Sequence, residues 1–353
     1  MAKVDSLLAS VPRLGGSDLH MISGQPPKVR IHGQIQKLNH PVMTQEMMEE
    51  YLLELLNPSQ KQKFLETGDL DFAYGLEGSG RFRCNYYKQL RGFGAVFRLI
   101  PERVKTIDEL GIPQVLKKLA MFRRGLVLVT GPTGSGKSTT LAAMVDHINS
   151  NVRKHIVTIE DPVEFVHQNK KSIITQREVG SDTESFAAAL RASCREDSDV
   201  VLVGEMRDVV TMQLAISAAE MGVLVFATLH TNTAAKTVDR IIDAFPSDQQ
   251  AQVRTMLSES IAAIVSQLLL RRADKEGRIA AFEILISSPA VANMIREQKV
   301  ASIPNVIEAG KAQGMQLMDD ELYNLASEGI ISGEDAYMKA TDKKRFLEFV
   351  DLS

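Results

Sequence analysis

The chain has 353 residues, too many for one small core, and this length predicts two domains. Its composition is typical of a globular protein, with 44% hydrophobic and 24% charged residues, and the formal net charge of -3 excludes a surface that is basic overall. The two cysteines, Cys84 and Cys194, are far apart and outside any C-x-x-C pair, which excludes a four-cysteine zinc module and indicates two buried thiols in a reducing compartment.

The N-terminal part of the chain is predicted to form a small α+β domain that covers residues 1–100. Its short stretches of alternating apolar and polar residues lie at 28–35, 70–74, 81–87 and 95–99. These stretches surround one helical segment at 44–64. Residues 101–113 begin and end with proline and show little periodicity, so we expect a linker there. No stretch of the chain approaches the ~20 apolar residues that a membrane-spanning helix needs, so we expect no transmembrane segment and a cytoplasmic location.

A different pattern begins at residue 114 and predicts an α/β domain over residues 114–288. Its predicted helix 114–122 is followed by apolar strands at 125–130, 156–159, 200–203 and 223–228. Because strands that alternate with helices are usually parallel and covered on both faces, we expect a mostly parallel sheet. Residues 289–353 are predicted to form a helical C-terminal region. Its helices are expected at 289–297, 318–328 and 333–339.

The most specific motif follows the first strand of this sheet. Residues 131–138 read GPTGSGKS and fit the phosphate-binding pattern G-x-x-x-x-G-K-[ST] at every constrained position, between a strand and a helix. The glycines let backbone N–H groups converge on phosphate oxygens, Lys137 reaches the outer phosphates, and the Ser138 hydroxyl ligates Mg²⁺. The predicted ATP-binding residues are Gly131, Pro132, Thr133, Gly134, Ser135, Gly136, Lys137, Ser138 and Thr139.

Polar residues directly follow the other three predicted strands. They read EDPVE at 160–164, GE at 204–205 and LHTN at 229–232. Ligands of open α/β sheets bind beyond the carboxyl ends of the strands, so these residues are predicted to meet at one nucleotide. Carboxylates after two strands supply a base that orients water and an anchor for Mg²⁺, which indicates hydrolysis. Taken singly, Glu160 or Asp161 is also compatible with helix capping, and His230 with a hydrogen-bonded loop.

Four segments in this order match the motifs of a known family. They are GPTGSGKSTTLAAM at 131–144, TIEDPVEFVH at 158–167, REDSDVVLVGEMRD at 195–208 and ATLHTN at 227–232. The chain resembles the secretion-ATPase superfamily, and most closely the PilT-type retraction ATPases of bacterial type IV pili. The resemblance covers nearly the whole chain. It implies a RecA-like ATPase core, a preceding PAS-like domain, and an ATPase activity that powers pilus retraction and twitching motility.

The resemblance also implies roles for three residues that follow the strands. Glu164 would be the catalytic base, Glu205 the Walker B carboxylate that holds Mg²⁺ through water, and His230 a sensor of the γ-phosphate. Physical chemistry agrees with these roles. A carboxylate near the γ-phosphate can orient the attacking water, while the metal and Lys137 neutralise the charge that develops on the phosphoryl oxygens.

Three arginines of the N-terminal domain form a further group of candidates. Arg81 and Arg83 are two residues apart and so lie on the same face of a predicted strand, and Arg98 lies in another stretch. Arginines in such positions also serve to discourage strand pairing at a solvated edge. The resemblance implies instead a homohexamer in which these arginines reach the triphosphate bound to the next subunit. It further implies docking on a platform protein at the cytoplasmic face of the inner membrane, with a paralogous retraction ATPase as another partner.

Two features favour retraction over pilus extension or secretion. The chain lacks the extra N-terminal domain that extension and secretion ATPases usually carry, and its two cysteines cannot form their four-cysteine zinc insert. The segment GMQLMD at 314–319 also resembles the retraction branch. In the branch's helical motif A-I-R-N-L-I-R-E, residues 290–297 carry Ala292 in place of an arginine, although the apolar spacing of the helix is kept.

Other interpretations stay open at this point. An accessory paralogue of the retraction motor, a pilus extension or type II secretion ATPase and, more remotely, a RecA-like nucleic-acid motor share the core motifs. We expect no nucleic acid, because the basic residues are not interleaved with aromatics and tryptophan is absent. An ABC-type signature and a guanine-reading N-K-x-D motif are both missing. The presence of Glu164 and Glu205 speaks against a nucleotide sensor that does not hydrolyse.

Overall fold

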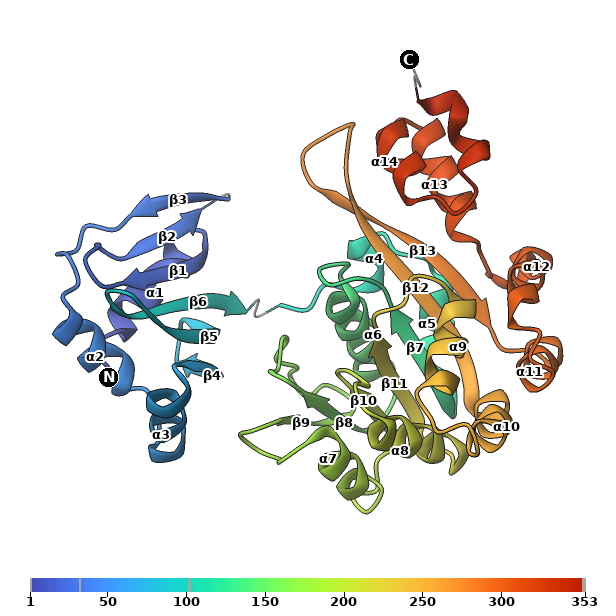
Figure 1. Ribbon diagram of the computed structural model, residues 1–353, viewed down its shortest axis with the longest axis horizontal. Helices are drawn as coiled ribbons and strands as arrows, with labels where there is room; N and C mark the ends of the chain where they lie inside the picture. Colours follow the sequence, from blue (N-terminus) through green and yellow to red (C-terminus); the bar gives the residue numbers. More distant parts are fainter. Residues whose placement is uncertain (1, 32, 101–102, 351–353) are drawn as a thin grey trace. The chain divides into compact units, whose positions relative to one another are not determined.

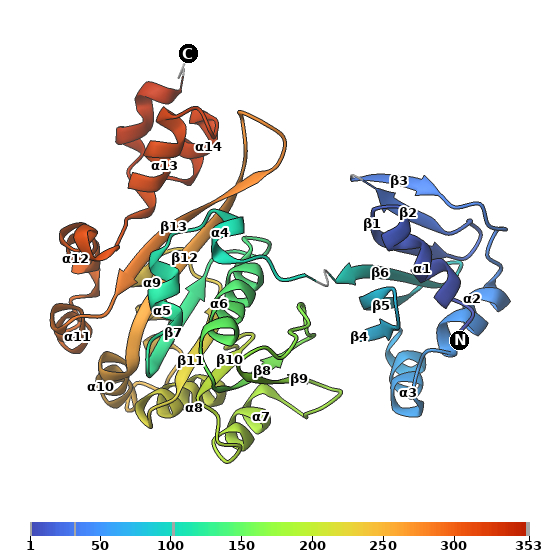
Figure 2. The same ribbon diagram turned by 180° about the vertical axis from the view of Figure 1, so that it is seen from behind.

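The computed structural model describes residues 2–31, 33–100 and 103–350, and Figures 1 and 2 show it from opposite sides. The chain divides into two compact units. The first unit comprises Met1–Arg103 with Pro162–Val166, and the second comprises Val104–Asp161 and His167–Ser353. The first two residues of the predicted linker lie outside the described residues, and the remainder contains a short helix, α4 (Ile107–Leu110).

A six-stranded antiparallel sheet with the order β3-β2-β1-β6-β5-β4 forms the centre of the first unit. Its strands are β1 (Gly16–Ile22), β2 (Lys28–Ile31), β3 (Gln34–Lys37), β4 (Asp69–Leu76), β5 (Gly80–Gln89) and β6 (Gly92–Ile100). In β5, Phe82, Cys84 and Tyr86 are fully buried, and the arginines that alternate with them are only half-buried. The rings that pack edge-on against Tyr86 are those of Phe64, Phe72 and Phe97. The predicted α+β fold of this part of the chain is confirmed.

The helical segment predicted at 44–64 is two helices in the structure. The helices of this unit are α1 (Asp5–Arg13), α2 (Gln45–Leu53) and α3 (Pro58–Thr67). Asn57 caps α3 and forms a reciprocal capping box with Gln60. Because a proline cannot continue a helix but fits the first turn of a new one, Pro58 separates α2 from α3. The prediction of one continuous helix was therefore wrong, and α1 was not predicted.

The second unit is built on a seven-stranded sheet with the order β13-β12-β7-β11-β10-β8-β9. Its strands are β7 (Gly125–Thr130), β8 (His155–Glu160), β9 (Ile173–Glu178), β10 (Val200–Val203), β11 (Leu224–Leu229), β12 (Ile261–Arg271) and β13 (Arg278–Ile286). All neighbouring strands pair in parallel except β12 and β13, which form an antiparallel hairpin. The predicted mostly parallel sheet is confirmed, whereas β9, β12 and β13 were not predicted.

Helices cover both faces of this sheet. Besides α4, the helices of the second unit are α5 (Val115–Ala120), α6 (Lys137–Asn151), α7 (Phe186–Ser193), α8 (Val209–Glu220), α9 (Ala234–Asp243), α10 (Gln250–Ser260), α11 (Pro289–Arg296), α12 (Ile303–Ala309), α13 (Met318–Ser327) and α14 (Gly333–Lys339). Short 3₁₀ helices lie at Val300–Ser302, Lys311–Gln313 and Lys343–Phe349. Helices α4 to α6 pack on one face, seen in Figure 2, and α7 to α10 pack on the other, seen in Figure 1.

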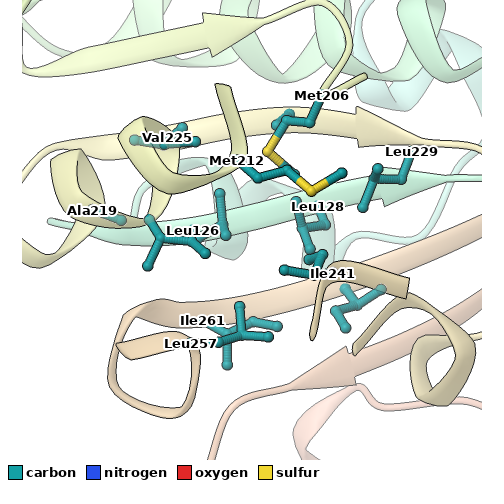
Figure 3. Close-up of a cluster of buried hydrophobic side chains, with 14 of the residues drawn as sticks. Leu126, Leu128, Met206, Met212, Ala219, Val225, Leu229, Ile241, Leu257 and Ile261 are labelled. Atoms are coloured by element: carbon teal, nitrogen blue, oxygen red, sulfur yellow. The ribbon is translucent and has the colours of Figure 1, made fainter. Parts of the chain in front are cut away.

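The interior strand β7 shows how completely both faces are buried. Leu126 and Leu128 pack into the cluster drawn in Figure 3, together with Met212 of α8. Val127 and Val129 point to the opposite face and join the side chains of α6. All six residues of β7 are buried. Because apolar side chains fill both layers beside β7, the polar groups that this strand contributes lie at and beyond its carboxyl end.

The C-terminal helix α11 has the packing that its apolar spacing predicts. Val291 and Ile295 are fully buried in the core of the second unit, and Met294 packs against it partly buried. The helix packs although Ala292 replaces the arginine of the related motif.

The two cysteines differ in exposure. Cys84 is buried, as expected, but Cys194 is exposed, so the prediction of two buried thiols was wrong for Cys194. The physical reason is that Cys194 is the C-terminal cap of α7, where the helix ends at the surface.

A matched pair of leucines in the first unit tests the position of its core. Leu19 is fully buried, whereas Leu90 is fully exposed in the turn between β5 and β6. We expect Leu19→Ala to lower the free energy of unfolding of this unit by about 2–5 kcal/mol, because it leaves a cavity. We expect Leu90→Ala to change it by less than about 0.5 kcal/mol. Urea unfolding followed by tyrosine fluorescence measures both values, and equal losses would contradict the assigned core.

Candidate active site

The predicted phosphate loop connects β7 to α6. Gly131, Gly134 and Gly136 have φ angles of 141°, 78° and 91°, in the region that favours glycine. Lys137, the first residue of α6, folds back over the loop, and its Nζ donates to the carbonyl oxygens of Gly131 (2.8 Å) and Pro132 (3.0 Å). The loop therefore places a cation beside the N-terminus of a helix, which is the arrangement that binds phosphates.

The side chain of Gln267 on β12 holds this loop in place. Its Nε2 donates to the carbonyl oxygen of Ser135 at 2.7 Å, and its Oε1 accepts from the Thr140 hydroxyl at 2.8 Å. Two glycines of the phosphate loop also approach Gln267 closely. A Cβ added to Gly131 would lie 2.2 Å from the Gln267 carbonyl oxygen, and one added to Gly136 would lie 2.9 Å from Nε2. Gln267 is therefore a positioning residue for the phosphate loop.

The loop fits a triphosphate with Mg²⁺. The Ser135 hydroxyl is buried and has no hydrogen-bond partner among the described residues, and such a group is normally completed by a ligand or water. Ser138 and Thr139 lie in the first turn of α6, where N–H groups make no bonds within the helix. A lysine, a buried hydroxyl, a helix N-terminus and the Ser138 hydroxyl are the groups that phosphates and their metal ion require.

Two predicted residues meet beyond the ends of β10 and β11. The Glu205 carboxylate lies 3.0 Å from Nε2 of His230 and accepts a hydrogen bond of 2.7 Å from Nε of Arg207. Arg207 also lies 3.7 Å from the carboxylate of Asp161, which follows β8. The expected meeting of Glu205 and His230 is confirmed, and Arg207 connects them to Asp161. Two carboxylates, an arginine and a histidine thus lie at the same edge of the sheet as the phosphate loop.

Backbone hydrogen bonds fix the strand ends that carry this cluster. Gly204 N–H donates to the carbonyl oxygen of Ile159 at 2.8 Å, and the Thr228 hydroxyl donates to the Gly204 carbonyl oxygen. Gly131 N–H donates to the carbonyl oxygen of Leu229 at 3.3 Å. The ends of β8, β10, β11 and β7 are thereby joined in the order in which they lie in the sheet.

The other predicted residues lie in the first unit. Glu164 is exposed. Arg83 and Arg98 are directly opposite each other on β5 and β6, and Arg81 shares the face of Arg83. Nε of Arg98 donates to the Asp18 carboxylate at 2.8 Å. Burial raises the pKa of Asp18, but its hydrogen bonds, including that from Arg98, outweigh burial and hold the pKa below its ordinary value. The structure thus brings the phosphate loop, Glu205 and His230 together in the second unit, while Glu164 and the arginines belong to the first.

Sequence reasoning missed two residues of this site. Gln267 lies far along the chain from the phosphate loop, in a strand that was not predicted. The signal was available, because Ser266 and Gln267 interrupt the apolar run 261–270, and the Ser266 hydroxyl lies 2.8 Å from that of Thr130. Arg207 follows Glu205 by two residues, but nothing in its spacing distinguishes it from a surface arginine.

Comparisons with known proteins agree with this geometry. Residues 3–334 match the family described as Type II/IV secretion system protein. The chain is 48% identical to the type IV pilus retraction ATPase PilT of Pseudomonas aeruginosa, over 97% of this chain and 99% of that protein. It is 41% identical to the type IV pilus ATPase PilU of the same organism, over 95% of this chain and 88% of that protein.

A solved structure also matches nearly the whole chain. The crystal structure of the pilus retraction motor PilT with bound ADP matches with a TM-score of 0.91 and 44% identity, over 99% of this chain and 100% of that chain. In the described part of this chain, no helix has both the length and the apolar character needed to cross a membrane. From its motifs, its site and the family match over residues 3–334, the chain belongs to the Type II/IV secretion system protein family.

Proposed function

We propose that this chain is an ATP-hydrolysing motor that powers the retraction of type IV pili and thereby twitching motility. The observation that carries the proposal is the similarity to the retraction ATPase PilT over nearly the whole length of both chains. The match to the ADP-bound PilT structure supports nucleotide binding at the phosphate loop. The proposed location is the cytoplasm, at the cytoplasmic face of the inner membrane.

The second unit supplies the groups that bind ATP. The backbone N–H groups of residues 131–139 surround the phosphates, and Lys137 pairs with their outer oxygens. The Ser138 hydroxyl and, through water, the Glu205 carboxylate would hold the metal ion. When bound, Mg²⁺ would supply positive charge to the phosphates. Gln267 keeps the loop in the shape that this binding needs.

Hydrolysis needs a carboxylate that orients a water molecule toward the γ-phosphate, and we assign this role to Glu164. Its exposed side chain and its place in the segment that follows β8 support the assignment. We assign the sensing of the γ-phosphate to His230, and its contact with the Glu205 carboxylate, 3.0 Å from Nε2, supports this assignment. In this assignment Glu164 orients the water, while His230 and Glu205 respond to the γ-phosphate and its metal ion.

The arginines of the first unit act in a neighbouring subunit. We propose a homohexamer in which Arg81, Arg83 and Arg98 provide positive charge to the triphosphate of the next subunit. Their common face on β5 and β6 supports this role. Arg98, whose Nε donates to Asp18, also keeps a side chain that is 69% exposed. The proposed partner of the hexamer is the platform protein of the inner membrane.

A second candidate is an accessory paralogue of the retraction motor. Ala292 favours it, because this position departs from the retraction motif. The higher identity to PilT than to PilU of the same organism favours the main motor.

The amount of surface pilin in cells that lack this gene decides between these functions. A retraction motor predicts excess pili without motility, cured by wild type but not by Lys137→Ala. Absent pili would instead indicate assembly or secretion, and unchanged pili would indicate an accessory paralogue or another machine. Either of these results contradicts the proposal.

The role of Glu164 predicts a separation of binding from turnover. We expect Glu164→Gln to lower kcat by about 10²-fold or more, because the amide cannot act as a base, while ATP still binds. Phosphate release and fluorescent-nucleotide binding measure the two effects. The exposed Glu276, in the turn between β12 and β13, is the control, and Glu276→Gln should leave both unchanged. Normal turnover in Glu164→Gln would remove Glu164 from its role.

The role of Gln267 predicts a loss of nucleotide affinity. In Gln267→Glu, a carboxylate oxygen replaces the amide that donates to Ser135, so two acceptors face each other. The resulting penalty of ~1–3 kcal/mol corresponds to an increase of about 5- to 150-fold in the Kd for ATP with Mg²⁺. Calorimetric titration measures it, with exposed Gln313→Glu as the control. An unchanged Kd in Gln267→Glu would show that β12 does not position the loop.

A further inference from the structure

A single side chain on β9 joins the two ends of the segment that carries Glu164. This segment, residues 161–166, begins directly after Glu160, the last residue of β8, and ends before His167. Oε1 of Gln176 accepts a hydrogen bond of 2.8 Å from the N–H of His167, and its Nε2 donates to Oε1 of Glu160 at 3.3 Å. Gln176 thus closes the base of this segment, which we call the Glu164 loop.

The sheet places Gln176 where it can reach both ends of the loop. Strands β8 and β9 are parallel neighbours, and Gln176 lies directly opposite Thr158. Because side chains alternate along a strand, Thr158 and Glu160 lie on the same face as Gln176. The Thr158 hydroxyl also donates to Oε1 of Glu160 at 2.7 Å, so two donors hold the carboxylate at the start of the loop. The pairing of β8 with β9 therefore fixes this end of the loop.

Helix α6 holds the chain that follows the other end of the loop. Asn149 of α6 is fully buried. Its Oδ1 accepts from the N–H groups of Lys170 (3.0 Å) and Ser172 (3.3 Å), and its Nδ2 donates to the carbonyl oxygen of Gln168 at 2.8 Å. A buried amide with these bonds fixes the backbone around it. The helix that begins at the phosphate loop therefore also supports the chain just beyond the Glu164 loop.

Both ends of the Glu164 loop belong to the second unit, although its middle does not. Residues 162–166 group with the first unit, whereas Asp161 and His167 belong to the second. Fixing both ends of a loop reduces the number of conformations that its residues can adopt. A reacting group on such a loop is placed more accurately, and a displacement of about 1 Å can cost about 10²-fold in rate. The bonds of Gln176 are therefore suited to position a catalytic carboxylate.

We propose that Gln176 is a positioning residue for Glu164. By closing the base of the Glu164 loop, it fixes the carboxylate that orients water toward the γ-phosphate. The effect on turnover rests on the proposed function, in which Glu164 is the base, whereas the closure of the loop does not. Gln176 acts through Glu164 and not on the phosphate loop, so the binding of nucleotide is independent of it.

Two variants of the full chain open the base of the loop, and a third is the control. Gln176→Leu removes both hydrogen bonds while it keeps a side chain of similar size. Gln176→Asn keeps the amide but is shorter by one methylene, so it reaches only one of the two partners. Thr175→Val removes a hydroxyl at the preceding position of β9, on the opposite face, where it lies 3.0 Å from Nε2 of His155.

Amide hydrogen exchange of the full chain without nucleotide tests the closure of the loop. We expect exchange at residues 163–167 to be faster by about threefold or more in Gln176→Leu and Gln176→Asn than in the wild type, because the loop loses its fixed ends. Thr175→Val should exchange at these residues as the wild type does. Unchanged exchange there in either Gln176 variant would overturn the proposal.

Turnover tests whether Gln176 acts through Glu164. We expect Gln176→Leu to lower kcat by about 10-fold or more and to leave the Kd of AMP-PNP with Mg²⁺ unchanged, because the carboxylate is displaced while the phosphate loop is intact. In a Glu164→Gln background, the same substitution should cause no further loss of kcat. Normal turnover in Gln176→Leu, or an equal loss of kcat in both backgrounds, would overturn the proposal.

The two measurements separate this proposal from the proposed function. A wild type that hydrolyses no ATP, combined with faster exchange at 163–167 in Gln176→Leu, would reject the proposed function and leave the closure of the loop by Gln176 intact. A wild type that hydrolyses ATP, combined with unchanged exchange in Gln176→Leu, would reject the closure and leave the proposed function intact.

Discussion

The rest of the structure depends on the burial of both faces of the parallel sheet in the second unit. The interior strand β7 is buried at every residue, with α6 on one side and the cluster around Leu128 on the other. The parallel strands therefore present polar groups to a ligand at the edge where they end. The phosphate loop, Glu205 and His230 all lie at that edge. The hairpin of β12 and β13 adds two buried polar side chains. Gln267 donates a hydrogen bond to the phosphate loop, and Glu283 accepts one from the first residue of α9.

Local patterns in the sequence were sufficient for much of this site. The glycine and lysine spacing predicts the loop, the residues after each apolar strand predict the meeting of Glu205 and His230, and the period of two predicts the common face of Arg81 and Arg83. The single helix predicted at 44–64 failed for a local reason that was visible in the sequence, since Pro58 follows a capping asparagine.

Gln267 and Glu283 could not be predicted in the same way. Each makes its contacts with residues more than thirty positions away, and each lies in a mainly apolar strand whose pairing is set by tertiary structure. A polar residue in such a strand signals a partner, but only the fold identifies it. The same holds for Cys194, whose exposure depends on where α7 ends. The second unit thus joins the phosphate loop to β12, and the start of α9 to β13, through side chains that lie far apart in the sequence.

The central claim is that the edge of the sheet binds the triphosphate of ATP, with Lys137 as its main charge. Calorimetric titration of the purified chain with ATP and Mg²⁺ tests it most directly, beside Lys137→Ala and the exposed control Lys275→Ala. The account predicts saturable binding by the wild type and the control, and an affinity about 10- to 100-fold lower for Lys137→Ala, because a charged hydrogen-bond donor to the phosphates is lost. Absence of binding by the wild type, or equal affinity in all three proteins, would contradict the account.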